Sequence, residues 1–457
     1  MVKLSGILSR FNPVKVVVIG DFMLDTYTTG KVKRISPEAP VSVLHVEKEE
    51  SRPGGAGNVA LNLISLGACV AVVGRIGFDL AGEKLRSALE NEGIATQYLF
   101  SQKEYKTPVK NRLIADSQQI LRVDFETVDP FPSWMEEEMT LQLPSLLDGV
   151  QTIAISDYGK GFLSKSFLQK IIALASERQI PVIVDPKGDD FSKYAGASLI
   201  KPNLLEAYTA AKLPLDTPLE QVAHMLLQHS GIETLMITRS ESGISLFNRA
   251  GERLDFPVRP KEVKDVTGAG DTVLSMISIA LANRLDMHYG AQLANIAAAM
   301  AVEKLGCARI TLSQVAERLL ELDVDNKIFD EEHLFALEQA LKGKRYTVLG
   351  VNSTQGMSTS LFRALRQLSF QDVDKKLIVY MRDYNSDEEF VSFLSSLDEV
   401  DFIVLKSESL KHLCDVIHPD QVFIIENEGL IALDHATALL SRIKEFSLSS
   451  ALGIDQK

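Results

Sequence analysis

Short apolar runs alternate with longer segments of helical periodicity from Val16 to about Leu320. The runs are rich in β-branched residues, as are strands that are buried on both faces of a parallel sheet. This alternation predicts an α/β fold in which a mostly parallel sheet lies between helices. The strands expected are 16–19, 70–73, 152–155, 182–184, 199–200 and 235–238, and the clearest helices are 167–177 and 219–228.

One early segment departs from this alternation. Residues 26–29 and 41–46 have the pattern of two paired antiparallel strands. They predict a small β lid beside the main sheet, which would close over a substrate or be buried in a dimer.

A second domain is predicted near the C-terminus. The segment 323–330 is polar and charged, and a new alternation of strands and helices begins at 346–351. We therefore expect a larger domain at 1–325, a linker at 326–344 and a small α/β domain at 345–457. Its further strands are expected at 377–380, 402–405 and 422–425, and its helices at 388–397 and 410–416.

Composition restricts the possible partners. The 457 residues are 46% hydrophobic and 24% charged, as in ordinary globular proteins. The formal net charge of -13 argues against nucleic acid as a partner. Cys69, Cys307 and Cys414 are far apart, so buried thiols are expected, with neither a disulfide nor a zinc site. The sequence shows no signal peptide and no membrane-spanning run, so no membrane partner and a cytoplasmic location are expected.

The strongest chemical signal is the segment 265–271, with the sequence DVTGAGD, directly before an apolar helical pattern. Gly268, Ala269 and Gly270 would present backbone N–H groups to phosphate oxygens at a helix N-terminus. Asp271 at the start of that helix can accept the proton of an attacking hydroxyl. A tight turn followed by a capping or first-turn aspartate explains the same residues equally well.

A glycine-rich segment at 52–58 opens another predicted helix. Gly54, Gly55 and Asn58 offer free backbone and an amide side chain to a polyhydroxylated ligand, and Asp21 follows the first strand as a carboxylate for sugar hydroxyls. A simple glycine-rich connection between strand and helix is the alternative.

Asn203 and Glu206 lie three residues apart after a predicted strand, with Leu204 and Leu205 between them. Amide and carboxylate on one helical turn can hold magnesium-bound water or phosphate. A capping box explains the pair without any ligand. Lys187 and Thr238, at other predicted strand ends, complete the nucleotide-binding candidates. All these positions follow strands, and the carboxyl edge of an open α/β sheet is where ligands collect.

Together, the glycine-rich segment at 52–58 and the TGAGD motif at 267–271 resemble the signatures of ribokinase-like (PfkB) carbohydrate kinases. Segments 20–25, 34–41, 52–56, 185–188 and 265–271 are similar to the D-glycero-β-D-manno-heptose 7-phosphate kinase branch. This resemblance implies transfer of the ATP γ-phosphate to the anomeric C1 hydroxyl of the heptose 7-phosphate. The product, heptose 1,7-bisphosphate, would lead to ADP-heptose for the lipopolysaccharide core. ATP and Mg²⁺ are the implied cofactors, and a homodimer is expected.

The resemblance also implies roles for the residues that match its motifs. Asp271 would be the catalytic base, and Gly268, Ala269 and Gly270 would form the anion hole. The segment 203–206 would contact ATP and, through water, magnesium. The sugar would face Asp21, Gly54, Gly55 and Asn58. For its 7-phosphate, Arg112 and Arg122 are the cationic candidates.

Members of this branch are often fused to a nucleotidyltransferase domain, which is Rossmann-like, and the tail has the matching order of elements. Such transferases carry a His-x-Gly-His element, whereas the corresponding stretch here, 351–358, reads VNSTQGMS. His333, His412, His418 and His435 form no such pair. We therefore predict a degenerate second domain without adenylyltransferase activity.

Three alternatives remain open from the sequence. The kinase acts on another sugar or a nucleoside, the whole chain is a non-catalytic sugar-phosphate-binding subunit, or the tail transfers nucleotide through a rearranged site.

Overall fold

The computed structural model describes residues 7–116, 118–258, 262–304, 306–322, 327–329, 334–370, 375–384, 386–405, 409–426 and 429–433. The chain forms two compact units, a larger one at 12–311 and a smaller one made of Met1–Phe11 and Leu312–Lys457. The boundary between the units therefore lies between residues 311 and 312. The charge pattern had placed it later, at residue 325. The segment expected to be a linker instead contributes Phe329, Leu337 and Leu341 to the core of the smaller unit, and these apolar side chains explain the difference.

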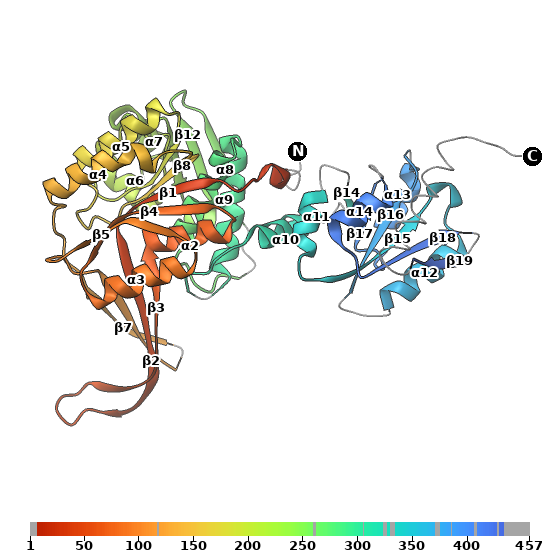
Figure 1. The fold of residues 1–457 in the computed structure, drawn as a ribbon, viewed down its shortest axis with the longest axis horizontal. Helices are drawn as coiled ribbons and strands as arrows, with labels where there is room; N and C mark the ends of the chain where they lie inside the picture. The colour runs from red at the N-terminus through yellow and green to blue at the C-terminus, as the bar shows by residue number, and fades with distance from the viewer. Residues whose placement is uncertain are drawn as a thin grey trace, which may run out of the picture. The chain divides into compact units, whose positions relative to one another are not determined.

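The larger unit is built on a nine-stranded sheet in the order β13-β12-β11-β10-β9-β8-β1-β4-β5 (Figure 1). Neighbouring strands are parallel, except that β12 pairs antiparallel with both β11 and β13 near one edge. All six predicted strands are confirmed, whereas the antiparallel edge strands and β5 were not predicted. In that spatial order the strands are Arg253–Phe256, Ile244–Asn248, Thr234–Thr238, Leu199–Ile200, Val182–Asp185, Thr152–Ser156, Lys15–Gly20, Cys69–Gly77 and Ala95–Gln102.

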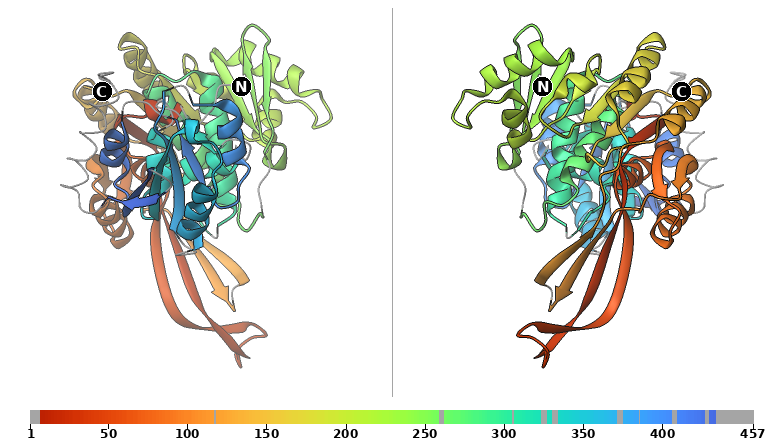
Figure 2. Two further views of the ribbon diagram at one scale, coloured as in Figure 1. Left: turned by 90° about the vertical axis from the view of Figure 1, so that its right-hand side faces the viewer. Right: turned by 90° about the vertical axis from the view of Figure 1, so that its left-hand side faces the viewer.

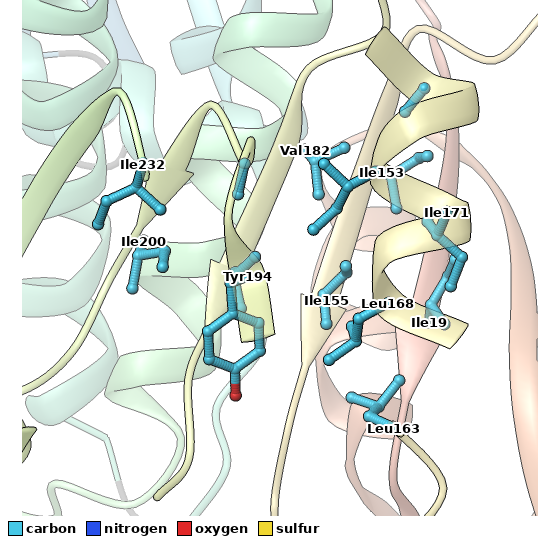
Figure 3. Packing of buried hydrophobic residues seen from close by; sticks show 14 of the residues in the cluster. Ile19, Ile153, Ile155, Leu163, Leu168, Ile171, Val182, Tyr194, Ile200 and Ile232 are labelled. Carbon is cyan, nitrogen blue, oxygen red and sulfur yellow. The ribbon is translucent and has the colours of Figure 1, made fainter. Parts of the chain in front are cut away.

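Helices cover both faces of this sheet. On one face, alternate strand residues such as Ile153 and Ile155 share a buried cluster with residues of α4 to α7, and Figure 3 shows them beside Leu168 and Ile171 of α5. On the other face, α2, α8 and α9 pack together and against the central strands. The helices are α2 (Ala56–Ser65), α3 (Leu80–Asn91), α4 (Ser133–Leu146), α5 (Lys165–Glu177), α6 (Leu204–Ala211), α7 (Leu219–Ser230), α8 (Ala269–Ala282) and α9 (Met287–Val302).

A separate four-stranded sheet, in the order β3-β2-β6-β7, projects from the larger unit as a long ribbon (Figure 2). Its strands are β2 (Phe22–Ile35), β3 (Ser42–Gly55), β6 (Val109–Ala115) and β7 (Gln118–Phe125). The predicted antiparallel lid is thus confirmed as β2 and β3, each longer than expected. Because β2 follows β1 directly and β3 runs into α2, this sheet is joined to the main sheet at the edge where β1 ends.

The smaller unit holds a six-stranded sheet in the order β14-β17-β16-β15-β18-β19, parallel except for β19. The strands and helices predicted beyond residue 345 are confirmed. Its strands are β14 (Ile328–Phe329), β15 (Arg345–Val351), β16 (Lys375–Met381), β17 (Phe402–Val404), β18 (Gln421–Glu426) and β19 (Gly429–Ala432). Its helices are α10 (Leu312–Leu322), α11 (Leu334–Leu341), α12 (Thr359–Phe370), α13 (Glu388–Ser395) and α14 (Leu410–Ile417).

Two further expectations concern membranes and thiols. Among the helices that the structure describes, none combines the length and the apolar character needed to span a bilayer. Of the cysteines expected to be buried, Cys414 is buried and Cys307 is partly buried. Cys69 is exposed, since it begins β4 at the amino edge of the sheet.

Candidate active site

Five neighbouring strands of the larger unit end in polar residues at one edge of the sheet. The order of the strands there is β11, β10, β9, β8 and β1. The polar residues at or just after their carboxyl ends are, in that order, Thr238, Lys201, Asp185, Tyr158 and Asp21. The sheet thus gathers residues that are far apart in the sequence, at the edge where ligands are expected.

Asp271 lies in the first turn of α8 and is only 6% exposed. Its Oδ2 accepts a hydrogen bond of 2.6 Å from the Asn58 amide, and its Oδ1 accepts one of 3.2 Å from the Tyr158 hydroxyl. Burial raises the pKa of Asp271 to about 7, although the Asn58 hydrogen bond and the nearby Lys201 act to lower it. A carboxyl group with this pKa is suited to accept a proton near neutral pH.

The turn before α8 is held open by glycine. Gly268 has φ of +80°, and a Cβ there would lie 3.1 Å from the Asn58 amide nitrogen and 3.3 Å from Cys307 Sγ. The first i to i-4 bond of the helix runs from the Thr272 amide to the Gly268 carbonyl. The amides of Gly270 and Asp271 come before that bond, so they remain available to an anion at the positive end of the helix.

A cavity of about 370 Å³, here called the Gly270 cavity, lies beside this turn. Its polar wall includes Lys201, Asn203 and Thr238, and Ala269 and Gly270 belong to the same wall. The rest is mostly apolar, from Ile244, Val258, Val263, Val266, Val273, Ala298, Ala299 and Val302. An apolar slot that ends at a lysine and a helix N-terminus fits a flat ring carrying phosphates.

Lys201 occupies the charged end of the Gly270 cavity. Its Nζ lies 3.0 Å from Asp185 Oδ2, and the lysine side chain is 3% exposed. A Cβ on Gly270 would lie 3.4 Å from the same Nζ. The ion pair of Lys201 and Asp185 therefore lies next to the N-terminus of α8. Burial raises the pKa of Asp185, while Lys201 opposes this.

Asn203 and Glu206 form a complete capping box at the start of α6. The Glu206 amide donates to Asn203 Oδ1 at 2.9 Å, and the Asn203 amide donates to Glu206 Oε2 at 3.1 Å. Lys187 Nζ lies 3.0 Å from Glu206 Oε1. The capping explanation thus holds, and Asn203 nevertheless lines the Gly270 cavity. Leu204, Leu205 and Glu206 lie outside its wall, and Leu205 is 63% exposed.

A second cavity of about 530 Å³, here called the Asp25 cavity, lies on the other side of Asn58. Its wall combines apolar residues with polar ones, among them Asp25, Arg52, Asn58 and Arg309. Asp25 is buried on β2, where Arg112 Nη1 donates to its Oδ1 at 2.6 Å. Carboxylate, amide and guanidinium groups around one hollow suit a ligand with hydroxyl and anionic groups.

Asp21 does not line the Asp25 cavity. Its Oδ2 accepts hydrogen bonds from the amides of Tyr158 and Lys160, at 2.9 and 3.0 Å. Burial, followed by the repulsion of Asp157, raises the pKa of Asp21 to about 6. The carboxylate thus anchors the loop after β8.

The two glycines expected at a sugar make room for protein side chains. A Cβ on Gly54 would lie 2.1 Å from Asp25 Oδ2, and one on Gly55, at φ of +57°, would lie 2.6 Å from the Asp21 carbonyl oxygen and 2.9 Å from Met23 Cε. Any larger residue at Gly54 would displace Asp25, and one at Gly55 would collide with the Asp21 carbonyl and Met23.

The two arginine candidates face each other across β6 and β7. Arg112 is tied to Asp25 and therefore lies beside the Asp25 cavity. Arg122 pairs with Asp124 at 2.9 Å, and its side chain is 49% exposed. Only Arg112 is thus brought to the other candidates.

Three residues of the site were missed in the sequence: Asp25, Tyr158 and Lys201. Tyr158 and Lys201 lie just after the ends of β8 and β10, so the strand ends were the available signal for these two, whereas Asp25 lies within β2. Asp25 was not chosen because Asp21, four residues earlier, is the first carboxylate after the apolar run of β1.

The residues present fit a magnesium nucleotide bound mainly through its phosphates. Within the described ranges no group of three or more His, Cys, Asp or Glu side chains is placed to hold a metal ion. Mg²⁺ commonly takes one or two carboxylates together with substrate phosphates and water, which requires no such group. Asp185 and Glu206 are the carboxylates at the Lys201 and Asn203 side of the site.

Comparisons with known proteins indicate the family of the chain. The profile of the pfkB family carbohydrate kinases matches residues 14–314. The "Bifunctional protein HldE" of Trichlorobacter lovleyi is 41% identical over 352 residues, 76% of this chain and 72% of the relative. That of Syntrophotalea carbinolica is 36% identical over 434 residues, 91% and 89% of the two chains.

Solved structures show the same fold at lower identity. Phosphofructokinase-2 from Escherichia coli aligns with a TM-score of 0.57 and 18% identity, over 68% of this chain and 99% of its own. The ribokinase of Arabidopsis thaliana, complexed with ribose and ATP, aligns with a TM-score of 0.53 and 17% identity, over 67% and 99%. The larger unit therefore has the ribokinase-like fold, and the chain belongs to the pfkB family of carbohydrate kinases.

Proposed function

We propose that the chain transfers the γ-phosphate of ATP to the anomeric C1 hydroxyl of D-glycero-β-D-manno-heptose 7-phosphate, on the route to ADP-heptose. One observation carries this proposal: Asp271 lies between the two cavities. Gly270, next to it in the chain, lines the Gly270 cavity, and its hydrogen-bond partner Asn58 lines the Asp25 cavity. The kinship with HldE proteins favours the heptose phosphate over other sugars.

In this proposal Asp271 accepts the proton of the C1 hydroxyl as its oxygen attacks the γ-phosphorus. The bond from phosphorus to the bridging β-phosphate oxygen breaks, and ADP leaves. The amides of Gly270 and Asp271 at the α8 N-terminus face the charge that develops on the transferred group. Asp271 must be ionised, so the rate should fall as the pH drops below about 7.

The acceptor would occupy the Asp25 cavity. Asp25 would accept hydrogen bonds from sugar hydroxyls, the role assigned to Asp21 from the sequence. Arg52, Arg112 and Arg309 are the cations in or beside this cavity, and they are the candidates for the 7-phosphate. Arg122 is not retained, because it lies with Asp124 instead.

The nucleotide would occupy the Gly270 cavity. Its apolar wall suits adenine, and Lys201, Asn203 and Thr238 lie where phosphates and ribose would be. Magnesium would be held by Asp185 or Glu206 with the phosphates and would neutralise their charge when bound. Lys187, paired with Glu206, is a further phosphate candidate.

The test is phosphorylation of heptose 7-phosphate with ATP and Mg²⁺, next to fructose 6-phosphate and ribose, with the products identified by phosphorus NMR. Heptose 1,7-bisphosphate formed by the natural chain and not by Asp271→Asn is the expected result. Turnover of another sugar only would assign a different acceptor, and no turnover at all would favour a non-catalytic binding subunit.

We also propose that the smaller unit is a nucleotidyltransferase-like domain without adenylyltransferase activity. Where β15 ends, the Ser353 amide donates to Asp383 at 3.0 Å, and its hydroxyl is also bonded to Asp383. Arg382 directly follows β16, and its Nη1 lies 3.5 Å from Glu426 Oε1. The acidic side chains would repel phosphates at the edge where a nucleotide would bind. Of the tail histidines, His412 lies in α14 and His418 directly follows it, whereas His333 and His435 lie outside the described residues.

Incubation of the full chain with heptose 1-phosphate and ATP tests this second proposal. We expect no ADP-heptose and no pyrophosphate. Product formation would show that a rearranged site transfers nucleotide.

Finally, we propose a cytoplasmic homodimer formed through the four-stranded sheet. Ile35, Val41, Leu121 and Phe125 expose 70%, 57%, 53% and 60% of their surface on that sheet or its turn. Ile35 and Val41 lie at the tip of the β2–β3 ribbon, and Leu121 and Phe125 lie on β7; a subunit interface would cover exposed apolar side chains of this kind. Light scattering should give twice the chain mass, and Phe125→Lys should lower it to one.

A further inference from the structure

Tyr158 is the residue that joins the loop after β8 to the first turn of α8. Its hydroxyl lies 3.2 Å from Asp271 Oδ1, while the Asn58 amide occupies Oδ2. We propose that Tyr158 is a positioning residue, which together with Asn58 clamps the Asp271 carboxylate in the orientation needed to receive the acceptor proton. The inference rests on the proposed role of Asp271 as the base.

The loop that carries Tyr158 is itself fixed by buried charged groups. The amides of Tyr158 and Lys160 both donate to Asp21, and the Lys160 carbonyl accepts a hydrogen bond of 2.7 Å from Arg75 Nη2. Arg75 is 2% exposed, and its guanidinium lies 4.0 Å from the Tyr105 ring centre. The backbone that carries the Tyr158 side chain is therefore held in place by these hydrogen bonds, as a positioning role requires.

The hydrogen bonds from Asn58 and Tyr158 oppose the effect of burial on the pKa of Asp271. Each donor favours the ionised carboxylate, as does Lys201, whereas Asp185 and desolvation favour the neutral acid. Cys307, the other titratable group at this turn, has its pKa raised to about 12 by burial and stays neutral. Removal of one donor should thus raise the pKa of Asp271 further.

The hydroxyl of Tyr158 remains a donor throughout the working pH range. The negative charge of Asp271 and burial raise the pKa of Tyr158 well above its usual value. Its ring lies beside Gly55, with Cε2 3.4 Å from the position that a Cβ on this glycine would take.

The test compares Tyr158→Phe with Tyr208→Phe, in the full chain with ATP, Mg²⁺ and the sugar that is turned over. Tyr208 is a matched control, because its hydroxyl also makes one hydrogen bond, of 2.7 Å to the Thr217 carbonyl. For Tyr158→Phe we expect the acid limb of the kcat profile to move up by about one pH unit, a loss of about tenfold at pH 6. KM for the sugar and the profile of Tyr208→Phe should not change.

Tyr158→Met also removes the donor while filling the space, and it must move the acid limb in the same direction. Unchanged profiles in both Tyr158 variants would overturn the inference. A raised KM with an unmoved acid limb would also overturn it, because it would make Tyr158 a contact of the sugar. If Asp271→Asn retained full activity, the proposed function would fail instead, which separates the two outcomes.

Discussion

Replacement of Asp271 by asparagine should stabilise the larger unit at pH 8 while it abolishes phosphoryl transfer. The reason is that burial raises the pKa of Asp271 from 3.8 to about 7. The folded state therefore holds the proton more tightly than the unfolded state. Below about pH 4 both states are protonated and burial of the charge costs nothing. The cost accumulates as the pH rises to about 7 and is constant above that.

The magnitude follows from the size of the shift. A rise from 3.8 to about 7 corresponds to at most about 4 kcal/mol above pH 7, at about 1.36 kcal/mol per pKa unit. Asparagine carries no charge, so it avoids this cost. Its single side-chain oxygen can accept from only one of the two donors, Asn58 and Tyr158, and the lost hydrogen bond reduces the gain in stability by about 1 to 2 kcal/mol at every pH. The difference between variant and natural chain should thus grow by about 3 kcal/mol from pH 5 to pH 8.

Urea unfolding of the full chain at pH 5, 6, 7 and 8 measures this difference. The transition of the larger unit is recognised by its shift when a non-hydrolysable ATP analogue is added. Asp216→Asn, which removes one exposed carboxylate between α6 and α7, is the control for the loss of a charge. A difference that stays constant over the four pH values would refute the reasoning, as would a variant less stable than the natural chain at pH 8.

Three further substitutions follow from the same contacts. Lys201→Met leaves the partly buried Asp185 carboxylate, whose side chain is 20% exposed, without its partner, so we expect a loss of about 2 to 3 kcal/mol in unfolding and a raised KM for ATP. Equal KM values for ATP would argue against a phosphate near Lys201. Gly268→Ala should lower kcat by about a hundredfold, because its φ of +80° positions the anion-binding amides; folding by circular dichroism is the control. Asp25→Asn should raise KM for the sugar more than for ATP, and the reverse pattern would exclude the Asp25 cavity as the acceptor site.

Local pattern was sufficient for much of the fold. Buried parallel strands are continuous apolar runs, so β1, β8 and β9 were found to within one or two residues. The edge strand β13 was missed, because it is largely solvated and its apolar pattern is weak. Its neighbour β12 was also missed, although it is buried along nearly its whole length. The domain boundary was misplaced because charge along 323–330 is a local property, whereas the packing of Phe329 and Leu341 is not.

The sequence by itself determined the parts of the site that depend on backbone geometry. The TGAGD motif sets a left-handed glycine before a helix, and the spacing of Asn203 and Glu206 sets a capping box. Both follow from contacts within a few residues. These local features located the edge of the sheet where the candidate site lies.

Only the tertiary structure decided which side chains meet there. Asn58 and Asp271 are 213 positions apart, yet they share a hydrogen bond of 2.6 Å. Asp21 and Asp25 are equivalent by residue type, and only the exit of β2 from the sheet buries one under backbone amides and opens the other to a cavity. Periodicity fixes the face on which a side chain lies, but the partner across that face depends on how distant segments pack.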